Sequence, residues 1–243
     1  MYAAAAWPGG YGCGAMGRGG FPARSFLELL HDQERDALLC AGPARRWGSG
    51  EMLVRAGDRA ESATVLLSGS VKVHKTAAEG AEVVLALLGA GDLLGEMSAF
   101  PDAVRSADAT ALEPVDGVVV SVSALRGFLS SHPRATSALL EMALTRLRLS
   151  DLRRIEFATA GSLARVATRL VELAERFGVQ RGDGAIEVAL PLTQEELAAW
   201  SASSRESTAR ALHTLRELGL LETHRRKLIV RDLERLRPHA AQL

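Results

Sequence analysis

The order of hydrophobic and polar positions divides the chain into three regions. Between residues 47 and 122, short apolar runs such as 64–67, 71–74 and 83–88 are separated by glycines. Runs of this length, with a turn about every ten residues, are typical of the strands of a small β-barrel or jelly roll. A short amphipathic helix is expected before them, over residues 24–40. The first region is therefore predicted to be a barrel domain.

The second region has helical periodicity. Residues 123–129 predict a short helix, and Pro133 suits the first turn of a longer one. No glycine or proline occurs from residue 134 to 160, so this helix would extend for about 27 residues, or ~40 Å. Its apolar residues lie on more than one side, which the surface of one small domain does not require. The pattern predicts a dimerisation helix followed by a hinge at Gly161.

The third region contains a helix-turn-helix pattern. A helix at 163–177 and a strand at 186–190 precede it, and the sequence TQEELAAWSASSRESTARALHTLRELG fills residues 193–219. Two further strands, 220–223 and 228–231, would flank a basic turn. A helix-turn-helix followed by such a two-stranded wing is a winged helix.

The ends of these helices carry capping signals. Thr193 and Ser203 each stand three residues before a glutamate, Glu196 and Glu206. This is the spacing of a capping box, in which side chain and backbone satisfy each other at a helix start. Gly219 follows the last apolar residue and would close the second helix. Both helices are therefore expected to begin at these two polar residues.

The second helix of the pair has two chemically different faces. Arg205, Glu206 and Arg210 fall on one side at about 100° per residue. The opposite side carries the residues that would pack on the domain core, namely Thr208, Ala211, Leu212, Leu215 and Leu218. An arginine fork suits bidentate contact with guanine, and a glutamate can accept from cytosine N4. The alternative is a charged face that only meets solvent.

Composition agrees with nucleic-acid binding and limits other classes. Residues 1–144 contain 12 Lys+Arg and 16 Asp+Glu, net −4, and residues 145–243 contain 17 and 13, net +4. The positive excess accompanies the helix-turn-helix, where phosphates would meet it. No run approaches the roughly 18 apolar residues of a membrane span, and the N-terminus lacks a secretory pattern. Two cysteines cannot build a disulfide framework, so a cytoplasmic location is expected.

In this order the three regions resemble the cyclic-AMP receptor protein and fumarate-nitrate regulator (CRP/FNR) family of bacterial transcription factors. The resemblance covers about residues 26–236 and depends on three motifs. They are the glycine ladder of the barrel, the segment GDLLGEMSAF at 91–100 with Arg105-Ser106-Ala107 after it, and Ser204-Arg205-Glu206-Ser207.

The resemblance implies an α+β fold with four segments. A disordered Gly/Ala-rich segment at 1–22 precedes a cyclic-nucleotide-binding-like β-roll, or jelly-roll barrel, at 23–131. The dimerisation helix at 132–160 and the winged helix-turn-helix domain at 161–243 follow.

The same resemblance makes the segment from Gly95 to Ser106 a phosphate-binding cassette. Gly95 would let the backbone approach an anion, and Arg105 and Ser106 would donate to a phosphodiester. Glu96 would accept from the ribose 2′-hydroxyl and be oriented by Arg146 of the long helix. The alternative is a Glu96–Arg105 salt bridge at the mouth of an empty barrel.

The base of the nucleotide is less closely defined. Ser150 and Asp151 occupy the positions of the family's base-contacting Thr-Ser pair, so Ser150 keeps a hydroxyl for adenine and Asp151 replaces the second one. Asp151 could equally pair with Arg148 or Arg154 on a solvated face. Met97 would line the pocket without specifying its ligand. Cyclic AMP is the expected effector, with another cyclic nucleotide or none as alternatives.

Other sensor chemistries fit the sequence poorly. An iron–sulfur cluster needs four thiolates, and the chain has two cysteines. His74 and His132 are candidate haem ligands, but lone histidines on such elements are usually structural or solvated. No spacing of His, Cys and Asp resembles a zinc site. No metal and no catalytic residue is therefore predicted.

On DNA, the resemblance places Arg205, Glu206 and Arg210 at the family's three base-contacting positions. It implies half-sites like TGTGA, arranged as an inverted repeat and bound by a two-fold dimer. One departure is Ala202, which stands in the turn where a glycine is usual. Phosphate contacts, which position the protein without conveying sequence, are expected from Ser204, Ser207 and Arg226.

The sequence thus predicts a cytoplasmic, homodimeric, DNA-binding transcription regulator and not an enzyme. Its expected partners are double-stranded DNA, a cyclic nucleotide and RNA polymerase, with no membrane. Ligand at the barrel–helix junction would bias the two winged helices across the hinge near Gly161. One alternative keeps the DNA-binding role without a nucleotide effector. Another is a nucleotide-gated regulatory subunit of an enzyme, although the C-terminal region has no phosphate loop or nucleophile elbow.

Overall fold

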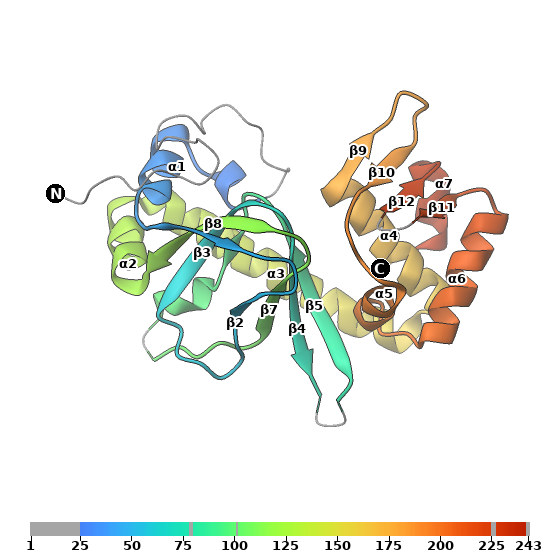
Figure 1. Ribbon diagram of the computed structural model, residues 1–243, viewed down its shortest axis with the longest axis horizontal. Helices are drawn as coiled ribbons and strands as arrows, with labels where there is room; N and C mark the ends of the chain where they lie inside the picture. Colours follow the sequence, from blue (N-terminus) through green and yellow to red (C-terminus); the bar gives the residue numbers. More distant parts are fainter. Residues whose placement is uncertain (1–24, 78–79, 101, 225–226, 242–243) are drawn as a thin grey trace. The chain divides into compact units, whose positions relative to one another are not determined.

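The computed structural model describes residues 25–77, 80–100, 102–224 and 227–241. These residues form two compact units (Figure 1). The first contains residues 25–74 and 87–145, and the second contains residues 75–86 and 146–241. The predicted disordered segment 1–22 lies outside the described residues, and so does Arg226.

Two four-stranded antiparallel sheets build the predicted β-roll. Their strand orders are β1-β8-β3-β6 and β2-β7-β4-β5. The central pair of the first sheet runs in register from Ser62↔Ser121 to Leu66↔Gly117. The strands are β1 Ala44–Trp47, β2 Met52–Val54, β3 Ser62–Ser68, β4 Val71–Thr76, β5 Glu82–Leu88, β6 Leu93–Leu94, β7 Asp108–Ala111 and β8 Val115–Ser121.

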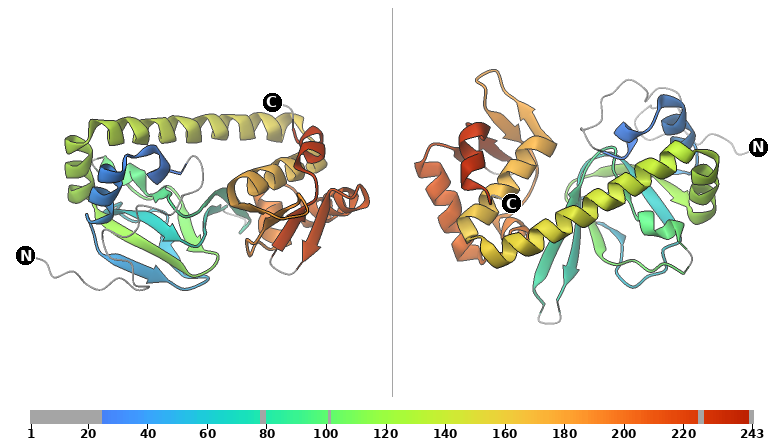
Figure 2. Two further views of the ribbon diagram at one scale, coloured as in Figure 1. Left: turned by 90° about the horizontal axis from the view of Figure 1, so that it is seen from above. Right: turned by 180° about the vertical axis from the view of Figure 1, so that it is seen from behind.

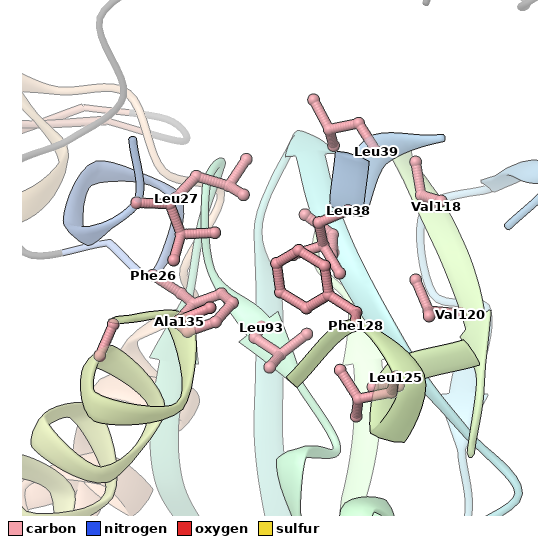
Figure 3. Packing of buried hydrophobic residues seen from close by; sticks show 14 of the residues in the cluster. Phe26, Leu27, Leu38, Leu39, Leu93, Val118, Val120, Leu125, Phe128 and Ala135 are labelled. Atoms are coloured by element: carbon pink, nitrogen blue, oxygen red, sulfur yellow. The ribbon is translucent and has the colours of Figure 1, made fainter. Parts of the chain in front are cut away.

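The core of the first unit joins the first sheet to the helices that precede and follow its strands along the chain (Figure 3). Val118 and Val120 of β8 meet Leu125 and Phe128 of α2 (Val122–Ser131) in one buried cluster. The start of α3 contributes Ala135 to the same cluster. Complete burial of side chains this size contributes about 1.5–3 kcal/mol each. This packing therefore fixes α2 and the start of α3 on the barrel.

The predicted helix at 24–40 is interrupted in the structure. A 3₁₀ turn, η1 (Leu27–Leu29), is separated from α1 (Asp32–Leu39) by residues in extended conformation. His31, with φ −68° and ψ 158°, is the N-cap of α1, and its backbone N–H donates to Glu34 Oε2 at 2.9 Å. The apolar residues on both sides are buried as expected, but this local cap breaks the helical continuity.

The long helix is confirmed as one element, α3 (Pro133–Thr159), of 27 residues (Figure 2). Its first half packs on the barrel core through Ala135, Ala138 and Met142. Large apolar side chains remain exposed along the rest of it: Leu140, Leu144, Leu147, Leu149, Leu152, Ile155 and Phe157. These side chains are between 40% and 63% exposed among the described residues.

The second unit has the predicted winged-helix elements. Helix α4 (Ser162–Phe177) leads into a four-stranded sheet of order β11-β12-β10-β9. The sequence analysis expected β10 and the two wing strands, whereas β9 was missed because its three residues carry no alternation. The bounds are β9 Gly178–Gln180, β10 Ile186–Val188, α5 Gln194–Trp200, α6 Arg205–Glu217, β11 Leu221–His224, β12 Lys227–Val230, α7 Leu233–Leu236 and η3 Arg237–His239.

One predicted capping box is confirmed and the other is wrong. Thr193 Oγ1 accepts from Glu196 N at 3.1 Å, and Glu196 Oε2 accepts from Thr193 N at 2.9 Å. At the start of α6 the N-cap is Ser204, whose Oγ accepts from Ser207 N at 3.1 Å. Ser203 instead donates to Ser201 O. The true cap leaves the Glu206 side chain free of a capping role.

The end of α6 is closed by Gly219, as predicted. Its φ of +69° is the left-handed conformation that glycine adopts without strain. Gly219 N donates to Arg216 O and Leu220 N donates to Leu215 O. These two bonds form a Schellman motif, which satisfies carbonyls at the helix end and turns the chain into β11.

Candidate nucleotide-binding cassette and nucleic-acid interface

The cassette begins at a sharp turn after β6. Gly95 has φ +81° and is the N-cap of η2 (Glu96–Ala99), a 3₁₀ turn of four residues. A Cβ on Gly95 would lie 2.1 Å from Arg105 Nη1 and 3.4 Å from Ser62 O. The left-handed backbone favours glycine here, and a Cβ would also displace the Arg105 guanidinium. The turn therefore brings the chain directly against the Arg105 guanidinium.

Arg105 is held in place without being neutralised by a hydrogen-bonded carboxylate. Its Nη2 donates to Ser62 O of β3 at 2.6 Å, and its backbone N donates to Asp58 O at 2.8 Å. Its Nη1 is buried and has no hydrogen-bond partner. Burial lowers the pKa of Arg105, while the nearby carboxylates of Glu96 and Asp58 act to raise it. A guanidinium remains charged in proteins, so one charged donor is left open beside Gly95.

A second polar atom in the cassette also lacks a partner. Ser98, in the middle of η2, is fully buried, and its Oγ has no hydrogen bond. Orphaned buried polar atoms are rare because each costs the free energy of its lost hydration. Two of them within one short cassette make it a candidate site for a polar ligand. The sequence analysis did not single out Ser98, because a serine in a turn carries no signal of burial.

The remaining predicted cassette residues are distributed as follows. Glu96 is close enough to Arg105 to affect its pKa. Met97 is 49% exposed, and Ser106 is also exposed. Within the first unit, the structure therefore brings Gly95, Glu96 and Arg105 together.

Arg146, Ser150 and Asp151 belong to the α3 segment of the second unit. Ser150 is exposed. Asp151 Oδ1 lies 3.5 Å from Arg154 Nη1, which is one of the two surface pairings considered for it. The contribution of these three residues to a nucleotide site stays a prediction.

The first turns of α6 form the candidate DNA-binding surface. Arg205, Glu206 and Arg210 are all strongly exposed. Arg210 Nη1 lies 2.6 Å from Glu206 Oε1, and its Nη2 donates to Ser207 Oγ at 3.2 Å. The apolar face predicted opposite them is buried at Thr208, Ala211, Leu212 and Leu215, whereas Leu218 is 42% exposed. The helix therefore packs by one face and presents its arginines on the other.

Glu195 is a member of this surface that the sequence analysis missed. Its carboxylate, in the first turn of α5, forms an ion pair with the Arg205 guanidinium. Both side chains are about two-thirds exposed, and exposed pairs of this kind contribute about 0–1 kcal/mol. Because solvent weakens this pair, Arg205 can exchange Glu195 for another acceptor at little cost in free energy. Ser204 caps the same helix start, and its Oγ also donates to Ser207 Oγ at 3.0 Å.

The histidines considered as haem ligands have other contacts. His74 is buried, and its Nε2 is 2.9 Å from Thr110 Oγ1. His132 stacks on Phe128, and its Nδ1 is 2.8 Å from Phe128 O. Across the described residues, no three His, Cys, Asp or Glu side chains are grouped as metal ligands would be. Nor does any described helix combine the length and apolar character needed to cross a membrane.

Comparison with known proteins assigns both units. Residues 44–132 match the model of the cyclic nucleotide-binding domain, and residues 164–238 match the Crp-like helix-turn-helix domain. The chain is 32% identical over 187 residues to the CRP-like cAMP-activated global transcriptional regulator of Mycobacterium tuberculosis, covering 77% of this chain and 83% of that one.

Two further proteins show the same relationship. The cyclic AMP receptor protein of Thermus thermophilus is 30% identical over 192 residues, covering 79% of this chain and 85% of that one. The structure of FixK2 from Bradyrhizobium japonicum superposes with a TM-score of 0.73 at 21% identity, over 83% of this chain and 98% of that chain. At 21% identity, the likeness to FixK2 shows the fold alone. The sequence matches are sufficient to conclude that this chain belongs to the CRP/FNR family of DNA-binding transcription regulators.

Proposed function

We propose that this chain is a homodimeric regulator that binds a palindromic operator and is controlled by cyclic AMP or a closely related cyclic nucleotide. The single observation that carries the effector is the buried, unpartnered Nη1 of Arg105, which faces the left-handed turn at Gly95. A phosphodiester is the ligand that this arrangement suits, because it offers charged oxygens to a fixed guanidinium donor. The cAMP-activated relatives from M. tuberculosis and T. thermophilus support the same assignment.

Each predicted site residue then contacts a particular part of the nucleotide. Gly95 admits the phosphate to the backbone, and Arg105 and Ser106 donate to its oxygens. Glu96 accepts from the ribose hydroxyl, oriented by Arg146, with Met97 beside the sugar or base. Ser150 and Asp151 contact the base from α3, where Asp151 would accept from an exocyclic amine. Adenine N6 can donate to this carboxylate, and so can guanine N2, so support for adenine comes from the hydroxyl of Ser150 and from the cAMP-activated relative.

The homodimer is inferred from α3. Leu140, Leu144 and Leu147 recur at a spacing of four and three residues, are 60%, 48% and 58% exposed, and form one stripe. Apolar residues at this spacing bury themselves against a second helix of the same kind. A Leu147→Arg variant should therefore sediment as a monomer. Leu149→Arg, about 200° around the helix from Leu147 and 42% exposed, is the matched control and should remain dimeric.

The effector is tested by calorimetry on the full chain. Wild type should bind cyclic AMP, and cyclic GMP should bind more weakly. Arg105→Leu should lose the binding of both while keeping its fold, because the substitution removes a charged phosphate donor and little packing. Wild type that shows no heat of binding with either nucleotide would contradict the effector assignment and favour the family member without a nucleotide. DNA binding, measured separately, would still stand.

RNA polymerase is a further partner that we propose for the DNA-bound protein. The relatives' role as transcriptional regulators supports this partner. The cytoplasm is the location that this role requires.

A further inference from the structure

Arg165 on α4 has contacts that the DNA-binding role of the domain does not by itself explain. Its Nε donates to Ser201 O at 2.9 Å, and its Nη2 donates to Ala202 O at 3.0 Å. Nη2 is also 3.3 Å from Ser203 Oγ. Three successive residues of the helix-turn-helix turn are therefore held by one side chain, which comes from a different helix about 36 residues earlier in the chain.

The turn that Arg165 holds is under backbone strain. Ala202 has φ +46°, and Asp102 is the other non-glycine residue among those described whose φ is positive. A side chain with a Cβ disfavours this left-handed region, which is why glycine is usual in such turns. Strained residues persist only where their surroundings over-determine them. The hydrogen bonds to Ser201 O and Ala202 O supply that constraint.

The same guanidinium extends to the end of the long helix. Arg165 Nη1 donates to Ala160 O at 2.6 Å, and its Cζ lies 5.6 Å from the centre of the Phe157 ring. Ala160 follows the last residue of α3 and precedes Gly161, the N-cap of α4. One side chain thus bonds the carboxyl end of α3 and the turn that sets the direction of α6.

We propose that Arg165 is a positioning residue for DNA binding: it fixes the strained turn between α5 and α6 and connects that turn to the end of α3. Arg165 does not itself contact DNA. It acts through Ala202, because the backbone angles of the turn determine how α6 leaves α5. A guanidinium with three nitrogens in a fixed plane is suited to three separate carbonyls, whereas an ammonium is a single point donor.

This role predicts a specific relationship between Arg165 and Ala202. Without the guanidinium, Ala202 is free to relax out of the left-handed region, and α6 changes direction. Glycine adopts φ +46° without strain, so Ala202→Gly removes the reason to relax. The effect of losing Arg165 should therefore be smaller when residue 202 is glycine. A residue that contributed only general stability would show no such dependence.

The test uses the full chain in four forms: wild type, Arg165→Gln, Ala202→Gly and the double variant. Binding is measured by fluorescence anisotropy at fixed salt. The two probes are a duplex selected from random sequences by the wild type and a scrambled duplex of the same length. Arg237→Gln is the matched control, since Arg237 is in the same unit and its ion pairs are with Glu175 and Glu234, away from the turn.

Arg165→Gln should weaken binding to the selected duplex at least tenfold and binding to the scrambled duplex less than twofold. Ala202→Gly alone should change neither by more than twofold, and in the double variant it should restore at least a third of the lost affinity. Arg237→Gln should bind as wild type does. Thermal unfolding and Trp200 fluorescence establish that each variant is folded.

Two results would overturn the proposal. One is wild-type affinity of folded Arg165→Gln for the selected duplex. The other is an equal loss on both duplexes that Ala202→Gly does not reduce. If Arg165→Gln does not fold, Arg165→Lys takes its place in the same comparison, because it keeps the charge and stem and loses the planar set of donors.

Discussion

The two units each place an arginine beside a left-handed residue, and they use it in opposite ways. In the first unit Gly95 has φ +81°, and Arg105 keeps its Nη1 buried and unpartnered beside it. In the second unit Ala202 has φ +46°, and Arg165 has an acceptor for every one of its three guanidinium nitrogens. The open donor of Arg105 lies in a short turn with a second unpartnered polar atom, Ser98 Oγ, which suits a ligand, whereas Arg165 uses all its nitrogens as a structural clamp.

The residue type at the two turns also differs: it is Gly95 in the first unit and Ala202 in the second. At Gly95 the guanidinium occupies the space where a Cβ would be, so a larger residue would displace it and would also strain the left-handed backbone. At Ala202 the guanidinium approaches from the side of the carbonyls, and the methyl group is tolerated at the cost of backbone strain. The two arginines thus differ in how their hydrogen bonds are used: Arg105 keeps one buried donor open, and Arg165 uses all three nitrogens.

A third arginine, Arg169 of α4, extends the comparison to full burial. Its side chain is 3% exposed and forms an ion pair with Glu156 of α3, which is 4% exposed. Arg169 Nη1 also lies 2.7 Å from Glu172 Oε1, and its Cζ is 5.5 Å from the Trp200 ring centre. Removing one partner of a buried pair leaves an uncompensated charge. Of the three arginines, Arg169 therefore depends most strongly on a carboxylate partner.

The largest expected effect comes from Glu156→Ala. Removing this buried partner should destabilise the second unit by about 3 kcal/mol, the lower end of the range for a broken buried pair, because Glu172 still lies beside Arg169. Chemical denaturation of the full chain measures this loss. Glu175→Ala is the control, because Glu175 is 45% exposed and its pair with Arg237 is at the surface. An equal, small effect of both substitutions would show that burial does not separate the two pairs.

Next in size is Gly95→Ala. It forces a side chain into a left-handed backbone and places its Cβ 2.1 Å from Arg105 Nη1. We expect a loss of stability of roughly 1–3 kcal/mol and loss of cyclic AMP binding by calorimetry. Gly50→Ala is matched for strain, since Gly50 has φ +80° and nothing within 4 Å of an added Cβ. Nucleotide binding should survive in that control, and its loss there would trace the effect to strain alone.

The smallest expected effect is at the DNA surface. Arg205→Ala should relax the preference for one guanine in each half-site and cost roughly 1–3 kcal/mol there. Arg226→Ala, outside the described residues, should weaken all sequences alike because we assign that arginine to the phosphates. Selection of random duplexes at fixed salt compares the two variants. If Arg205→Ala keeps the wild-type consensus, its exposed pair with Glu195 is its main role.

Local patterns in the sequence were sufficient to predict most helices and strands of the fold. The alternation and glycine spacing of the barrel predicted β3, β4 and β5, and the absence of glycine and proline predicted α3 to within one residue at each end. The spacing of Thr193 and Glu196 predicted a real capping box. Such signals succeed because they depend on neighbours within about four residues. The same local reasoning chose Ser203 instead of Ser204 as the cap of α6, since both positions are serines near a glutamate.

The sequence by itself thus determined the order of the elements, the two faces of α6, and the cassette residues Gly95, Glu96 and Arg105 through their motif. Only the tertiary structure decided which arginine keeps an unpartnered nitrogen and which one has all three guanidinium nitrogens hydrogen-bonded. Arg105 meets Ser62 across 43 residues, and Arg165 meets Ser201 across 36. Hydrogen bonds between residues so far apart leave no periodic trace, because they depend on how separate elements pack and not on the conformation of any one of them.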